Sequence, residues 1–140
     1  MTSRTTEAQE TPAGWRNFFL GAALYDLVLG AGFFFLYPQI FTILNIQLPN
    51  NISYIHLSAA VVFVQGAGYW FVYKNPVRNL DMVRLGVLYK AAYAGLAFYY
   101  LAIGQLISPV FALFAVADIV FLLGFVQFIR TTVGSRKTTP

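Results

Sequence analysis

Apolar residues along this chain gather in four long runs that polar segments separate. The runs cover residues 15–37, 54–73, 85–106 and 109–129. Each has the length of about 20 residues that a helix needs to cross about 30 Å of hydrocarbon, and none shows the alternation of a transmembrane β-strand. Because a backbone in lipid must satisfy its own hydrogen bonds, the pattern predicts four membrane-spanning helices.

The polar segments at the two ends and after the first run define the domain. Residues 1–14 and 131–140 are polar, and we expect both to be disordered, the second as a basic tail, so that the transmembrane domain is 15–130. Residues 38–53 carry prolines and asparagines around a semi-apolar stretch. They predict a loop at the membrane interface, with one helical turn between Ile40 and Leu44.

The other two connections are shorter. Residues 74–84 contain a proline turn, after which Asn79 or Asp81 is placed to cap the third helix. Residues 107–108, followed by Pro109, form a tight link. We therefore expect the third and fourth helices to form an antiparallel hairpin.

Composition supports a membrane protein. Hydrophobic residues make up 59% of the 140 residues, charged residues make up 10%, and the mean hydropathy is +0.66, whereas soluble domains carry about 25% charged residues. So few charges exclude a disordered chain, a nucleic-acid-binding surface and an ordinary soluble domain. The expected surroundings are membrane lipids, and no nucleic acid is expected as a partner.

The placement of lysine and arginine predicts the orientation. Apart from Lys90, these residues lie in the leader, the second loop, the tail or the helix ends beside them, and the first and third loops contain none. Basic residues favour the cytoplasmic side. The predicted fold is an all-α, antiparallel four-helix bundle in the cell membrane with both termini cytoplasmic.

Residue usage excludes several kinds of chemistry. The chain has no cysteine and one histidine, His56, which excludes disulfides, iron–sulfur clusters and a multi-histidine metal site within one chain. Catalytic-triad, Walker and dinucleotide-binding motifs are also missing from the sequence. We expect no cofactor, no metal and no evident catalytic site.

Three charged residues fall within the apolar runs, namely Asp26, Lys90 and Asp118. Each costs about 2.5–3.5 kcal/mol at the centre of a bilayer, so such residues face the bundle interior and mark possible sites. With Gln65 and Tyr93 they make up a candidate intramembrane polar cluster. Its members either join the helices by hydrogen bonds or form a working site.

The direction of each helix predicts which charges pair. Side chains lean toward the N-terminus of their own helix, so Asp26 leans toward the depth of Lys90 and Asp118 leans away from it. We therefore predict an Asp26–Lys90 ion pair rather than an Asp118–Lys90 pair. The candidate partners of Asp118 are then Gln65, Tyr93 and Tyr100.

Helical spacing predicts which face of the third helix is polar. Lys90, Tyr93 and Tyr100 share a face with the small residues Gly86 and Ala97, and could line a small pocket. Tyr89 is expected to turn away from this face.

Several short motifs resemble the DoxX-like type of small bacterial four-helix membrane protein. They are residues Gly66 to Tyr69, Asn75 to Arg78 and Gly86 to Lys90, and Asp118 before the aromatic end of the fourth run. The resemblance covers residues 60–129, half of the chain. It implies a bacterial inner-membrane protein, and it does not imply a redox function for this chain.

Three functions fit the sequence. The favoured one is a non-enzymatic membrane protein, either an accessory or interaction subunit or a binder of a small apolar molecule between its helices. The second is a proton- or ion-coupled transporter or channel that works as an oligomer, and the third is an intramembrane enzyme acting on a lipid or isoprenoid. Expected protein partners are further copies of the chain or a larger membrane complex.

Overall fold

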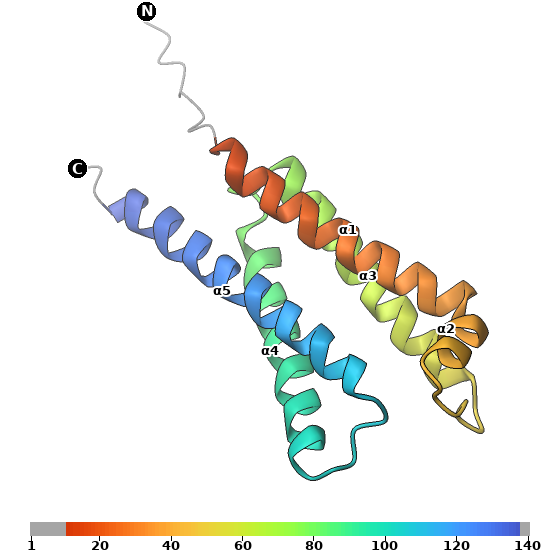
Figure 1. Cartoon of the computed structure of the whole chain (residues 1–140). Coiled ribbons are helices and arrows are strands. Elements are labelled where there is room, and N and C mark those ends of the chain that lie inside the picture. The colour runs from red at the N-terminus through yellow and green to blue at the C-terminus, as the bar shows by residue number, and fades with distance from the viewer. Residues whose placement is uncertain (1–10, 138–140) are drawn as a thin grey trace, which may run out of the picture.

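The structure, a computed structural model, describes residues 11–137, and every regular element within that range is helical (Figure 1). The helices are α1 (Ala13–Phe35), α2 (Tyr37–Ile43), α3 (Ser53–Lys74), α4 (Leu80–Ala102) and α5 (Pro109–Lys137). The all-α prediction is confirmed for this part of the chain. The helical turn predicted between Ile40 and Leu44 is part of the longer helix α2, which ends at Ile43 with Leu44 as its C-cap.

Three of the helices, α1, α3 and α5, are long and apolar enough to cross a membrane. The fourth long helix, α4, has the same length of 23 residues as α1. Lys90 and four tyrosines make α4 less apolar than the other three. Many large apolar side chains on the outer faces are exposed, among them Val28 at 69% and Leu88 at 68%, as expected of helices whose solvent is hydrocarbon.

The helix ends follow from local chemistry, and two of them correct the predictions. Pro38 has no N–H to continue α1, so α1 ends at Phe35 and Pro38 takes a place in the first turn of α2. The third predicted span was expected to reach residue 106, but α4 ends at Ala102. Gly104 adopts a positive φ of 68°, and the Gln105 N–H donates to the Tyr100 carbonyl, so the chain turns away in a Schellman motif.

The predicted cap of the third span is also different. Asn79 does precede α4, but its side chain forms no cap of α4. Its amide nitrogen instead donates to the carbonyls of Phe71 and Asn75, at 3.0 and 2.9 Å. Asn79 therefore satisfies the end of α3, while Asp81 pairs with Arg84 on the surface.

The C-terminal segment differs from the prediction as well. Residues 131–137 are helical, not disordered, because α5 continues to Lys137. The Thr131 hydroxyl donates to the carbonyl of Phe128 at 3.0 Å, which satisfies this polar group within the helix. At the other end α1 begins at Ala13, and residues 11–12 before it form no regular element. The remaining residues predicted to be disordered, 1–10 and 138–140, lie outside the described range.

The long helices form two antiparallel pairs (Figure 1). α1 packs closely against α3, because a side chain on Gly30 would meet the backbone nitrogen of Phe63 at 2.6 Å and one on Gly66 would meet that of Leu27 at 2.7 Å. α4 packs against α5 through the buried residues Ala94, Ala97 and Ala115. We call these pairs the α1–α3 hairpin and the α4–α5 hairpin.

The two hairpins meet through large side chains. Phe19 of α1 stacks on Phe125 of α5, with ring centroids 5.4 Å apart, and Tyr69 of α3 lies 5.0 Å from Phe125. Gly86 of α4 makes room for Tyr69 and Phe125, since a side chain there would come within 3.0 Å of both rings. We call this aromatic core the plug.

The plug lies toward the end of the molecule at which α1 begins and α5 ends. We call this the terminal end, and the opposite end, which holds α2 and the α4–α5 connection, the α2 end. The hairpins spread apart toward the α2 end in Figure 1.

Candidate functional site

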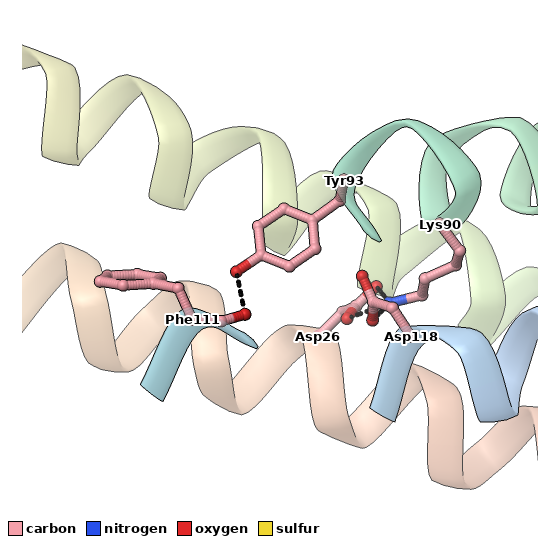
Figure 2. Close-up of polar contacts among 5 residues, drawn as sticks. All are labelled: Asp26, Lys90, Tyr93, Phe111 and Asp118. Carbon is pink, nitrogen blue, oxygen red and sulfur yellow. Dashed lines mark hydrogen bonds and ion pairs between the residues drawn. The ribbon is translucent and has the colours of Figure 1, made fainter. Parts of the chain in front are cut away.

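A buried lysine between two buried aspartates joins the two hairpins (Figure 2). The Lys90 ammonium donates to Oδ1 and Oδ2 of Asp26 at 2.8 and 3.0 Å, and to Oδ1 of Asp118 at 2.8 Å. The side chains of Lys90, Asp26 and Asp118 are 1%, 1% and 6% exposed. We call these three residues the charged triad.

The predicted Asp26–Lys90 ion pair is confirmed, but the expectation that Lys90 avoids Asp118 is wrong. The reason is the true start of α4. Because the helix begins at Leu80 and not at residue 85, Lys90 lies near the middle of α4 and at the depth of both aspartates. Lys90 and Asp118 therefore pair within the α4–α5 hairpin, and Asp26 reaches them from α1.

Aromatic rings surround the lysine. Its ammonium nitrogen lies 5.2 to 5.7 Å from four ring centroids, a distance at which rings attract a cation. These rings belong to Tyr25, Tyr69, Tyr89 and Phe121. Lys90 thus donates three charge-assisted hydrogen bonds and lies within an aromatic cage, and these interactions together offset the cost of burying an ammonium.

None of these four rings was predicted from the sequence to lie at this site, and for two of them, Tyr25 and Tyr89, a signal was present. Tyr89 was expected to turn away, and Tyr25 was not considered. Each directly precedes a member of the triad, in the dipeptides Tyr25-Asp26 and Tyr89-Lys90, and this repeated pattern was the available signal. Adjacent residues can both face the site because the triad lies among several helices, so that more than one narrow stripe of a helix points inward.

The other members of the predicted cluster lie beside the triad. The Tyr93 hydroxyl donates to the Phe111 carbonyl at 3.3 Å, away from Asp118 (Figure 2). Gln65 neighbours Tyr69 on α3, and its buried amide nitrogen makes no hydrogen bond of good geometry. Tyr100 is 42% exposed. The partner of Asp118 is therefore Lys90, and none of the three candidates named from the sequence.

A cavity of about 120 Å³ lies between the hairpins on the α2 side of the triad. Asp26 and Asp118 line it together with three tyrosines, and the remaining lining is largely apolar. The tyrosines are Tyr25, Tyr89 and Tyr93. Lys90 is not part of the lining, so the cavity meets the carboxylate side of the triad.

The cavity adjoins a wider hollow of about 790 Å³ at the α2 end. Phe33, Ile55, Ser58 and Phe111 line both spaces, and residues 45–50 of the loop after α2 line the hollow. Toward the terminal end, the plug fills the space between the hairpins. The site is thus an apolar passage that leads from the α2 end to two buried carboxylates.

Other features of the described residues lie apart from this site. His56 contacts the rings of Phe34 and Tyr37 at the α2 end. Within residues 11–137, no group of three or more histidine, cysteine, aspartate or glutamate side chains is placed to hold a metal ion.

Comparison with known protein families, with curated proteins and with solved structures finds no match to this chain.

Proposed function

We propose that this chain is a multi-pass membrane protein that binds a small apolar molecule in the cavity between its two hairpins. The cavity carries this proposal, because it is lined by apolar side chains yet ends at the carboxylates of Asp26 and Asp118. Ligand sites are commonly apolar pockets with a few placed polar groups that fix the orientation of the ligand.

The topology that goes with this function has four crossings and both termini in the cytoplasm of a bacterial cell, so that the protein lies in the inner membrane. Two features support it. α1 begins and α5 ends at the same end of the molecule (Figure 1), which requires an even number of crossings. Arg16, Lys74 and Arg78 lie at that terminal end, and basic residues are enriched on the cytoplasmic side of a membrane.

The closed inner end of the passage favours binding over conduction. The plug separates the triad from the terminal end through tightly packed rings. A channel or transporter built on these helices would have to part the Phe19–Phe125 stack in order to connect the cavity with the other side. A binding protein needs no such movement.

A binding role suits an accessory subunit of a larger membrane complex or a homo-oligomer. We also keep the resemblance to DoxX-like proteins as part of the proposal. Its motifs include Lys90 and Asp118, two members of the triad. They also include Gly66, where α3 approaches α1, and Gly86, where α4 makes room for the plug.

The test is photolabelling in lipid nanodiscs with an octanol that carries a diazirine. Ser58 lines both the cavity and the wider hollow, so Ser58→Phe narrows the passage between them. We expect saturable adducts on cavity residues of the wild type, and in Ser58→Phe a loss of more than half of them. Peptide mass spectrometry locates and counts the adducts.

The matched control is Ala60→Phe, two positions along α3 at an exposed residue outside the cavity lining. It should label like the wild type. Labelling that does not saturate, or that falls equally in both variants, contradicts the proposed function.

A further inference from the structure

We propose that the ligand of this cavity is an amphiphilic amine, whose protonated ammonium group binds beside Asp118 and whose apolar tail runs toward the α2 end. This inference rests on the proposed function and adds the chemical class of the ligand. It follows from the hydrogen bonds of the triad, its charge, the rings beside it and the shape of the passage.

The triad leaves one acceptor without a donor. The ammonium of Lys90 has three protons and makes three contacts, and Asp26 uses both of its oxygens. Asp118 uses Oδ1, whereas its Oδ2 accepts no hydrogen bond from the described residues. The Asp118 side chain is 6% exposed and lines the cavity, and a carboxylate oxygen that meets a largely apolar cavity without a donor is costly. A ligand that donates to Oδ2 would remove this cost.

The charge of the triad selects a cation. Two carboxylates and one ammonium carry a formal charge of −1, and no further lysine, arginine or histidine of the described residues contacts them. A neutral ligand would leave this charge in place in a low-dielectric interior, whereas an ammonium would cancel it.

The side chains next to Asp118 suit an ammonium. Tyr25, Tyr89 and Tyr93 line the same cavity, and aromatic rings beside a carboxylate are a recurrent setting for organic ammonium ions. The buried Tyr25 hydroxyl, beside this cavity, has no hydrogen-bond partner among the described residues. A hard metal cation would need about six or more oxygen ligands, which this site does not supply.

The size of the passage requires a tail. Cavities of about 150 Å³ hold a benzene molecule, so the cavity of about 120 Å³ has room for an ammonium group and only a few carbons. A longer chain must continue past Phe33 and Phe111 into the wider hollow of about 790 Å³. Both spaces are lined mainly by apolar side chains, which suit an unbranched hydrocarbon.

The experiment measures how well unlabelled octylamine and unlabelled octanol compete with the diazirine-bearing octanol in nanodiscs. The two competitors share a tail and differ in charge. In the wild type we expect octylamine to halve the labelling at a concentration about tenfold lower than octanol, as befits a charge-assisted hydrogen bond. Asp118→Asn should abolish this preference, so that the two competitors halve the labelling at similar concentrations.

The matched control is Asp81→Asn, which removes the same charge from a surface residue paired with Arg84 and should keep the preference of the wild type. A preference that persists in Asp118→Asn overturns the inference. Equal competition by amine and alcohol in the wild type, a result that needs no variant to fold, overturns it while leaving apolar binding intact. Absence of saturable labelling by any probe overturns the proposed function as well.

Discussion

At the scale of single residues, the three members of the charged triad contribute unequally to stability. Lys90 is the only cation of the triad and contacts both carboxylates, so each aspartate depends on it. Removing one partner of a buried ion pair leaves an uncompensated charge, which is far more costly than replacing the pair as a whole. The loss of Lys90 would bring two carboxylates together, whereas the loss of one aspartate charge leaves a neutral pair.

We therefore expect two variants of the triad to lose stability to very different extents. Lys90→Met should lower the free energy of unfolding by about 3–5 kcal/mol, because it removes the lysine charge and leaves Asp26 and Asp118 facing each other. Asp118→Asn should be tolerated with a much smaller change. Thermal unfolding in a mild detergent compares the two, and equal loss in both variants would contradict the neutral-pair argument.

At the scale of helices, the two hairpins are built differently. α1 and α3 approach so closely that backbone lies against backbone at Gly30 and Gly66. α4 and α5 approach through alanine side chains. Small residues allow such contacts between helices in lipid, where packing replaces the hydrophobic effect as the main attraction.

Gly30→Ala should separate α1 from α3. Its new methyl group would lie 2.6 Å from the Phe63 nitrogen and 2.8 Å from the Ala59 carbonyl oxygen, and backbone atoms cannot move aside as a flexible side chain can. We expect a loss of about 1–3 kcal/mol, the usual cost of overpacking, measured as a lower unfolding temperature.

Gly21→Ala is the control for that variant, because nothing lies within 4 Å of its new methyl group. It should be neutral or slightly stabilising, since alanine is the better helix former. If Gly30→Ala proved as stable as Gly21→Ala, the close contact of α1 with α3 would be wrong.

The helices show how far the sequence alone could lead. The lengths of the apolar runs predicted the long helices, because each helix must be long enough to cross the hydrocarbon whatever it packs against. The end of α4 depended on the backbone conformation of Gly104, and the Asn79 amide bonds the helix before it rather than the one after it. Neither is visible in a hydropathy pattern, although a glycine followed by a polar residue hints at the first.

The same distinction applies to the site. The unusual charges Asp26, Lys90 and Asp118 stood out because each is costly in lipid. Their mutual pairing depended on the depth of each residue. An error of five residues in the start of α4, more than one helical turn, removed Asp118 from the expected contacts. The cavity arises between hairpins that are distant in sequence, and no local pattern could predict it.

At the scale of the whole molecule, α1 begins and α5 ends at the same end of the long helices (Figure 1), and the proposed topology puts these two helix ends on one side of the membrane. The chain contains no cysteine, so a single introduced cysteine reports its own side of the membrane. Gly134 near the end of α5 has nothing within 4 Å of an added Cβ, and Asn50 is exposed at the α2 end. These two positions probe the two sides.

In intact bacterial cells, a membrane-impermeant maleimide should label Asn50→Cys and spare Gly134→Cys. Both variants should react after the cells are permeabilised, which serves as the control for accessibility. Labelling of Gly134→Cys from outside would contradict cytoplasmic termini, and with them the four-crossing topology.

The division of the triad between the hairpins has a consequence for biogenesis. Lys90 and Asp118 belong to one hairpin and can neutralise each other within it, whereas Asp26 finds no cationic partner inside its own. The ribosome makes that first hairpin before Lys90 exists. Stable membrane integration of the N-terminal half should therefore depend on the arrival of the C-terminal half, with Lys90 as the residue that completes assembly.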